Sequence, residues 1–292
     1  MFSNIIVGVN GRDGGRDATA LAAALREAGA RLTFAHVHVS DLIPGRGANA
    51  DFDLAQDALA SELVVRERNL WGHPADVRTI AAASVGDGLE QIASDREADL
   101  IVVGACERGA VGRVLAGDDA ASVLHQAERA VAIAPRGYAA SQHQIRKVGV
   151  AFDGSAESEI ARTLAGRLAE GLGAELVARC VVTPHVFATG IAAGAAYMED
   201  PEDVLSRTRT ALGDRAATTE VVLGPIDSEL GAFSEQVDLL VCGTRHNNVL
   251  RRVALGSTSA YLAHHAGCPL IVTGSSPAFG DDAPGHSPAA VA

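Results

Sequence analysis

The chain has 292 residues, of which 48% are hydrophobic, 21% are charged and 4% are aromatic, and its net charge is −12. This length is about twice that of a common domain, so two domains with separate cores are expected. The acidic balance, without any run dense in Lys and Arg, argues against a general binder of nucleic acid or of a membrane surface. Any anion-binding site must therefore be local.

Short apolar runs alternate with helical patterns from the beginning of the chain. The first run ends in Asn10-Gly11, and the segment after it is rich in Ala and Leu. Strands that alternate with helices predict an α/β fold built on a doubly wound parallel sheet. In the first half we predict strands at 5–9, 31–39, 77–82, 99–103 and 131–134, and helices at 17–28, 53–71, 88–97 and 114–128.

The same order of elements begins again near residue 148. The apolar strand at 148–151 repeats the opening strand at 5–8 at an offset of 143 residues, while Gly243 and Gly256 follow Gly104 and Gly117 at an offset of 139. A repeat of this length is better explained by two copies of one domain than by one large fold. In the second half we predict strands at 148–151, 175–182, 219–223, 238–242 and 270–272, and helices from Ser155 to 171 and at 201–212, 227–236 and 257–265.

The fold class is therefore predicted as α/β, with two tandem doubly wound, Rossmann-like domains. Their expected limits are 1–138 and 139–274, joined by a linker at 137–144. The segment 275–292 is rich in Pro, Gly, Ser and Ala without periodicity, and it is expected to be a disordered tail.

The four cysteines are dispersed and form no C-x-x-C pair, so reduced structural thiols are expected rather than disulfides or a zinc site. They are Cys106, Cys180, Cys242 and Cys268. The sequence shows neither a signal peptide pattern nor a transmembrane run, and a cytoplasmic location is the default expectation.

The segment that follows the predicted strand 238–242 has the features of a phosphate-binding loop. Gly243 ends the strand, and Gly256-Ser257-Thr258 opens a helix. Backbone N–H groups at a helix N-terminus bind anions, and the helix dipole adds to this attraction. Ligands of open α/β sheets bind outside the carboxyl ends of the strands, where Asp153 and the backbone near Val181 are also expected. The Asp153 carboxylate could hold a divalent cation or a ribose hydroxyl.

Both halves resemble the universal stress protein family in its tandem form, over nearly the whole of residues 1–274. Nucleotide-binding members of that family carry G-x-x-G, nine residues and G-[ST] after the fourth strand. In the second half, Gly243-Thr244-Arg245-His246 and Gly256-Ser257 follow this pattern, except that His246 replaces the second glycine. The resemblance implies an adenine nucleotide, ATP, with or without Mg²⁺. The site residues that it implies are Ala151, Phe152, Asp153, Val181, Cys242, Gly243, Arg245, His246, Gly256, Ser257, Thr258 and Ser259.

The replacement at His246 leaves two alternatives open. Glycine at such a place supplies positive φ or lets the backbone approach a phosphate, and histidine is among the non-glycine residues enriched at positive φ. The imidazole could therefore assist phosphate binding or block it. Arg251-Arg252, in the same loop, could equally be a phosphate clamp or a solvated pair.

The first half departs further from the family pattern. Its aspartate position is Asn10, its second glycine is Glu107, and Asp118 and Asp119 follow Gly117. Each carboxylate at about 4 Å from a bound phosphate would cost roughly 4 kcal/mol at an effective dielectric constant near 20. We therefore expect no triphosphate in this half.

The resemblance implies a stress-response regulator or partner-binding module, with no catalytic residue, no metal-ligating cluster and at most weak ATPase activity. A slow ATP-hydrolysing switch would need Asp153 or His246 as a base, and a scaffold that has lost nucleotide binding is a third alternative. The resemblance also implies that the two domains pack as a pseudo-dimer through their terminal strands, and two chains could pair further as a homodimer.

Overall fold

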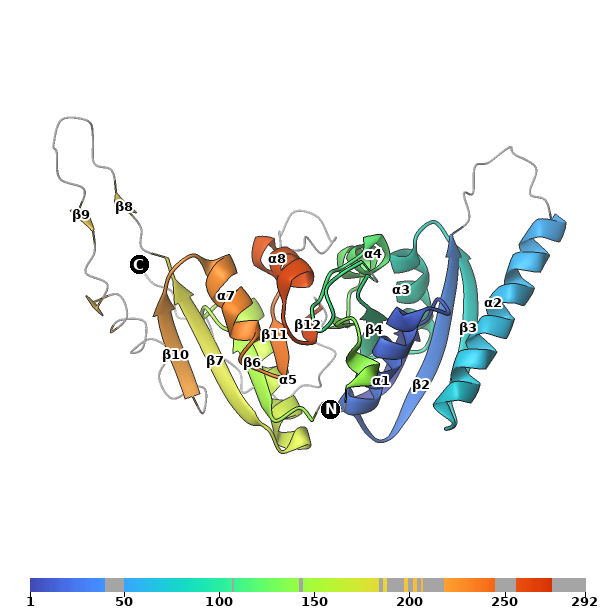
Figure 1. Cartoon of the computed structure of the whole chain (residues 1–292), viewed down its shortest axis with the longest axis horizontal. Coiled ribbons are helices and arrows are strands. Elements are labelled where there is room, and N and C mark those ends of the chain that lie inside the picture. Colours follow the sequence, from blue (N-terminus) through green and yellow to red (C-terminus); the bar gives the residue numbers. More distant parts are fainter. Residues whose placement is uncertain are drawn as a thin grey trace, which may run out of the picture.

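A ten-stranded sheet runs through the computed structural model from one end to the other (Figure 1). The strand order is β10-β7-β6-β11-β12-β5-β4-β1-β2-β3, so each half contributes five neighbouring strands. The structure describes residues 1–39, 50–106, 108–141, 144–183, 186–187, 197–198, 202–203, 206, 218–244 and 256–274. The predicted tail 275–292 and most of the predicted helix 201–212 lie outside these residues.

The first half alternates strands and helices as its apolar pattern predicts. Its elements are β1 (Phe2–Gly8), α1 (Asp13–Leu25), β2 (Arg26–Val39), α2 (Ala50–Trp71), β3 (Asp76–Ala82), α3 (Val85–Asp95), β4 (Leu100–Gly104), α4 (Asp118–Gln126) and β5 (Ala130–Ala134). A short 3-10 helix, η1 (Tyr138–Ala140), follows them.

The second half repeats this order. Its elements are β6 (Lys147–Ala151), α5 (Ala156–Leu172), β7 (Glu175–Val182), β10 (Thr218–Leu223), α7 (Ile226–Ser234), β11 (Leu239–Cys242), α8 (Ser257–His265) and β12 (Leu270–Val272). A separate two-stranded sheet pairs β8 (Val186–Phe187) with β9 (Tyr197–Met198). None of the helices in the described ranges is long and apolar enough to span a membrane.

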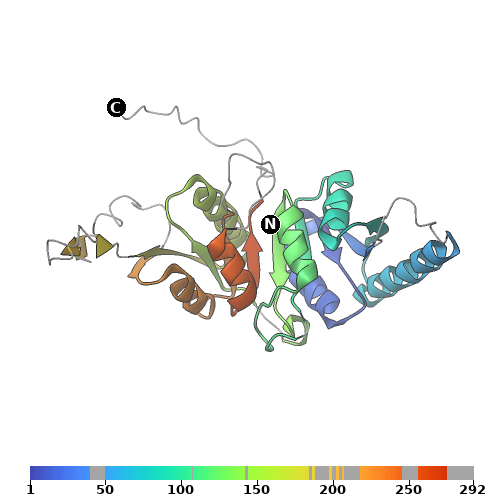
Figure 2. The same ribbon diagram turned by 90° about the horizontal axis from the view of Figure 1, so that it is seen from above.

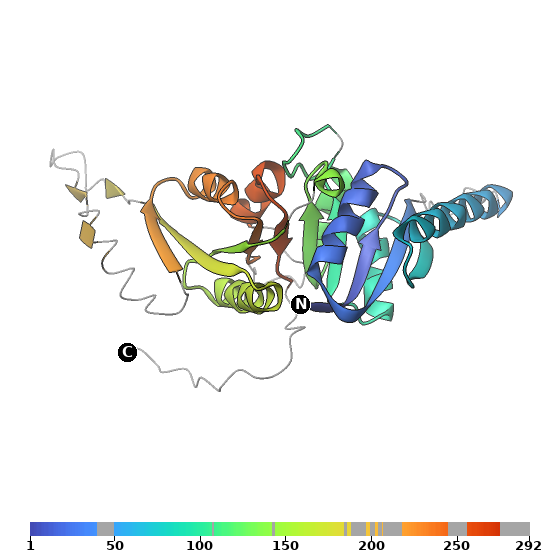
Figure 3. The same ribbon diagram turned by 60° about the horizontal axis from the view of Figure 1, so that its bottom comes forward.

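Helices cover both faces of the sheet, which makes each half doubly wound (Figure 2). Helices α1 and α5 bury residues such as Leu21 and Leu164 in a core on one face. Helices α3, α4, α7 and α8 bury residues such as Leu89 and Phe233 in a second core on the other face. The predicted α/β class with two related parallel halves is confirmed. Helix α2 projects from the far end of the first half (Figure 3).

The two halves meet where β5 pairs with β12. This pairing is antiparallel, with Ile133 opposite Leu270 and Val131 opposite Val272, whereas every other described pairing in this sheet is parallel. All six residues of the junction are buried. Each half therefore has no free edge at its fifth strand.

The segment between β4 and α4 forms a second connection between the halves. The backbone N–H of Val114 donates to the carbonyl of Ala266 at 2.8 Å, and that of Ala116 donates to Ala263 at 2.7 Å. Arg113 also pairs with Glu235 at 2.5 Å. The prediction of a helix from residue 114 was wrong, because the amides of residues 114 and 116 bond to the other half and the helix begins at Asp118.

The first helix and the second strand also differ from the prediction. The helix covers Asp13–Leu25 instead of 17–28, so Asp13 to Arg16, which lie before the predicted helix, form its first turn. Strand β2 begins at Arg26 and contains Gly29 at a φ of +83°, where a bulge shifts its register against β1. The predicted limits of strands 175–182 and 270–272 are confirmed to the residue.

The segment predicted as a linker is partly anchored. The buried Asp17 carboxylate accepts hydrogen bonds from the backbone N–H groups of Gly137 and Ala139, both at 2.8 Å. A buried carboxylate satisfied by two amides fixes the chain at the point where it leaves the first half.

The close packing of α1 on β4 generates a stability prediction. A Cβ at Gly104 would lie 2.1 Å from the Gly14 carbonyl oxygen. We expect Gly104→Ala to lower the free energy of unfolding by about 1–3 kcal/mol, because one backbone must move away from the other. Urea denaturation measures this change.

Gly166→Ala in α5 is the matched control. Its Cβ would meet only Leu176, at 3.9 Å. Alanine favours a helix over glycine by up to about 1 kcal/mol, so this variant should be neutral or more stable. Equal stability of Gly104→Ala and the wild type would contradict the role given to this contact.

Candidate functional site: two related cavities

Each half has a cavity at the carboxyl edge of its sheet, between its first and fourth strands. In the first half these strands are β1 and β4, and in the second half they are β6 and β11. The two strands of each pair are neighbours in the sheet, and the chain continues from them toward opposite sides. This is the point at which open α/β sheets bind ligands. The two cavities therefore lie at equivalent positions of the repeat.

The same local turn shapes both cavities. The Asp153 carboxylate accepts a hydrogen bond from the backbone N–H of Ser155 at 3.0 Å, and Asn10 accepts one from Arg12 at 3.1 Å. An amide oxygen thus replaces the carboxylate in the first half without loss of the turn. Ser155 caps α5, since its hydroxyl accepts a hydrogen bond from the N–H of Ser158 at 3.2 Å.

The cavity of the second half collects most of the predicted site residues. It has a volume of about 90 Å³, which is below the range of about 300–1,000 Å³ that is typical of ligand pockets. Of the predicted residues, it is lined by Ala151, Phe152, Asp153, Val181, Cys242, Gly243, Gly256, Thr258 and Ser259. Ser257 begins α8 beside them but is not in the lining, and Arg245 and His246 lie outside the described residues.

The N-terminus of α8 is free of acidic residues and of a side-chain cap. Gly256 is its N-cap residue without a side-chain hydrogen bond, and no acidic residue lies in the first turn. The buried Ser259 hydroxyl donates to the Gly256 carbonyl at 3.1 Å, so it does not cap the first N–H groups. The geometry suits an anion, because these N–H groups have no intrahelical acceptor.

Arg179 is a wall of the second cavity that the motif comparison missed. It lies on β7 and is only 7% exposed, with its guanidinium 4.5 Å from the centre of the Phe233 ring. Its Nε donates to the Glu220 carboxylate at 2.9 Å. A single cation inside the apolar run 176–182 was the available signal, since a buried charge requires a specific partner.

The thiol of Cys242 faces the same cavity in a protonated form. Burial raises its pKa to about 12. It is therefore an apolar wall near neutral pH rather than a nucleophile. All four cysteines are free thiols.

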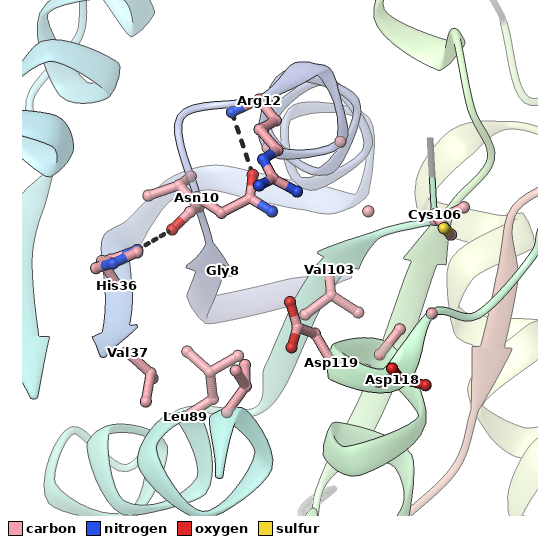
Figure 4. A pocket seen from close by; sticks show the side chains of 18 of the residues that line it. Gly8, Asn10, Arg12, His36, Val37, Leu89, Val103, Cys106, Asp118 and Asp119 are labelled. Atoms are coloured by element: carbon pink, nitrogen blue, oxygen red, sulfur yellow. Dashed lines mark hydrogen bonds between the residues drawn. The ribbon is translucent and has the colours of Figure 1, made fainter. Parts of the chain in front are cut away.

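The cavity of the first half is much larger, at about 650 Å³. Apolar side chains from several elements form part of its walls, and Figure 4 shows polar side chains among them on several sides of the cavity. The apolar lining includes Val9, Val37, Val85, Leu89 and Val103, and the polar lining includes Asn10, Arg12, His36, Cys106, Arg108, Asp118 and Asp119.

Small residues explain the greater volume of the first cavity. Ala35 pairs with Gly8 in the sheet as Arg179 pairs with Ala151, so an alanine lies where the second half has an arginine. Gly14 likewise lines the first cavity where Glu157 lines the second. The larger side chains of the second half fill space that is open in the first.

The polar groups of the first cavity include donors, such as Arg12 and Arg108, as well as acceptors. His36 Nδ1 lies 2.7 Å from the Val9 carbonyl and must donate to it, so Nε2 of the neutral ring is an acceptor. Asp119 lies between Val103 and Leu89 with its carboxylate directed into the cavity (Figure 4). The pKa of the Arg108 guanidinium is raised, first by its hydrogen bond and charge interaction with Cys106 and then by the charge of Asp118.

The described residues form no group of three or more potential metal-ligating side chains. His264 and His265 end α8, and His265 stacks on Tyr261 with ring centres 4.1 Å apart. A histidine is favourable near a helix C-terminus, where the helix dipole is negative.

Comparisons with known proteins agree with the repeat. The sequence pattern of the universal stress protein family matches residues 1–135 and again residues 144–274. A universal stress protein of Mycobacterium tuberculosis is 25% identical over 209 residues, which cover 66% of this chain and 70% of that protein.

Solved structures share the fold. A universal stress protein from Archaeoglobus fulgidus has a TM-score of 0.66 at 16% identity, covering 94% of this chain and 99% of its own. A shorter universal stress protein, solved in complex with cAMP, covers 46% of this chain and 98% of its own at 22% identity, with a TM-score of 0.34. Because the family pattern matches both halves, this chain belongs to the universal stress protein family, in its tandem two-domain form.

Proposed function

We propose that the second domain binds one adenine nucleotide, ATP, and that the protein is a cytoplasmic stress-response regulator that acts through partners rather than through catalysis. The observation that carries this proposal is the N-terminus of α8. Its first N–H groups have no side-chain cap, its first turn carries hydroxyl side chains, and no acidic residue lies there. The first domain has two carboxylates at the same place.

The nucleotide would lie across the predicted site, with its phosphates on Gly256 to Ser259. Gly243 allows the close approach of its strand to α5, since a Cβ there would lie 2.8 Å from the Glu157 carbonyl oxygen. The base would lie toward Val181 and Cys242, and Arg245 and His246 would complete the phosphate side. We retain 1–138 and 139–274 as the proposed domain limits, and the β5–β12 pairing supports a pseudo-dimer of the two domains.

Because Arg179 lines the small second cavity, we expect its side chain to move when the base enters. Its partner Glu220 is 43% exposed, so the ion pair can open toward solvent at modest cost. The contact of the guanidinium with Phe233 would be lost at the same time.

Placing the two aspartates of α4 at the equivalent positions of α8 tests the phosphate site. We expect Ser257→Asp/Thr258→Asp to weaken ATP binding by at least tenfold, because two anions would face the phosphates. Isothermal titration measures the affinity. The variant should fold, since α4 already carries Asp118-Asp119 at the equivalent positions.

Ser155→Ala is a control at the rim of the same cavity that adds no charge, and its ATP affinity should change less than that of the double variant. ATP binding that is equally tight in wild type and in Ser257→Asp/Thr258→Asp would rule out this site. Absence of binding in both would favour the scaffold alternative.

Truncation of Arg179 tests the volume argument. We expect Arg179→Ala to bind ATP about tenfold more tightly, because the base no longer has to displace a paired guanidinium; this ratio corresponds to about 1.4 kcal/mol. The comparison uses titration of folded protein, with Arg162→Ala on α5 as a control for loss of a partly buried, paired arginine outside the cavity. Weaker binding by Arg179→Ala would instead show that the guanidinium contacts the nucleotide.

A further inference from the structure

We infer that the cavity of the first domain binds a nucleoside that carries no phosphate. This inference concerns the other domain and goes beyond the proposed function. The volume of about 650 Å³ lies within the range of small-molecule pockets.

The inner part of the first cavity suits a flat heterocycle. Val37, from β2, and Leu89, from α3, form apolar walls of the cavity (Figure 4). Ala35, which lies two residues before Val37 on β2, leaves space beside them. Leu89 is 1% exposed and Val37 is 8% exposed, so both walls are held in place by the core. Apolar walls of this kind bury the faces of an aromatic ring.

Acceptor groups that stand between the apolar walls favour a ligand that carries hydrogen-bond donors. Asp119 makes no ion pair or side-chain hydrogen bond with any part of the chain that the structure describes, and its carboxylate points into the cavity (Figure 4). His36 adds a second acceptor. A carboxylate that accepts from ribose hydroxyls is a recurring feature of nucleoside recognition at the edge of α/β sheets.

The acidic N-terminus of α4 disfavours phosphate in this cavity. Asp118 and Asp119 occupy the first turn of α4, where their negative charges already interact with the helix dipole. Arg12 and Arg108 line the cavity as well, but both are exposed, and Arg108 interacts with Cys106 and Asp118. Solvent screening reduces the attraction that exposed guanidinium groups can offer to a phosphate.

Part of the cavity rim is bonded to the rest of the protein. Its segment from Cys106 to Gly117 is closed on itself by a hydrogen bond from the Cys106 N–H to the Leu115 carbonyl at 2.7 Å. The bonds from Val114 and Ala116 to the C-terminal end of α8 anchor it to the second domain. A preformed rim lowers the entropic cost of binding a small neutral ligand.

The test compares adenosine, AMP and ATP on the full chain. Cys106 lines the first cavity and is partly accessible, whereas the other three cysteines are buried, so its alkylation by iodoacetamide reports occupancy of this cavity. We expect adenosine to slow the alkylation of Cys106 at concentrations at least tenfold lower than AMP or ATP require. Titration calorimetry gives the affinities independently.

Two double variants test whether the carboxylates of α4 cause the preference for adenosine over AMP. Asp118→Ser/Asp119→Thr copies the sequence of α8 into α4, and we expect it to tighten AMP binding at least tenfold relative to adenosine. Glu27→Ser/Asp95→Ser removes two exposed carboxylates outside the cavity and should leave the preference for adenosine unchanged.

Either of two results would overturn the inference: AMP that protects Cys106 as well as adenosine does in the wild type, or adenosine that gives neither protection nor heat. Neither result bears on ATP binding to α8. Conversely, loss of the second-domain site with adenosine still protecting Cys106 would contradict the proposed function alone.

Discussion

The antiparallel pairing of β5 with β12 is the contact on which the arrangement of the whole molecule depends. An unpaired edge strand offers its N–H and C=O groups to other chains, and here each domain covers the last strand of the other. The same contact brings α8 close enough for the segment 105–117 to bond to its C-terminal end. One cavity thus lies at the N-terminus of α8, while the rim of the other is anchored at its C-terminus.

This arrangement lets two copies of one fold diverge at their sites while they share a single framework. Both copies keep the turn after the first strand, the close approach of helix and fourth strand, and the N-terminus of the last helix. They differ in what fills these places. The first copy has small residues and carboxylates, whereas the second has Arg179 and hydroxyl groups. The first cavity is therefore larger, and carboxylates stand at its helix N-terminus where the second cavity has hydroxyl groups.

Much of the fold could be predicted from the sequence, because the apolar periodicity of strands and helices is set locally. The repeat was visible from Gly104, Gly117, Gly243 and Gly256 alone. The start of α4 could not be predicted, since the amides of residues 114 and 116 are bound by carbonyls of the other half, about 150 residues away.

The candidate site was only partly predictable for the same reason. Most of the residues that the motif spacing selected line one cavity, but the spacing gave no information about its volume. The contrast between Ala35 and Arg179 depends on strand register, and only the pairing of β1 with β2 and of β6 with β7 shows that these residues are equivalent. The acidic residues at 118 and 119 were the basis for predicting no triphosphate in the first half, whereas the open cavity beside them was not expected.

The central claim is that one chain holds two different ligands in two copies of one site. Native mass spectrometry of the purified chain, mixed with equal amounts of ATP and adenosine, tests it most directly. The account predicts a complex that contains one ATP and one adenosine. Two ATP molecules per chain, or a chain that takes adenosine and ATP only in competition with each other, would contradict it.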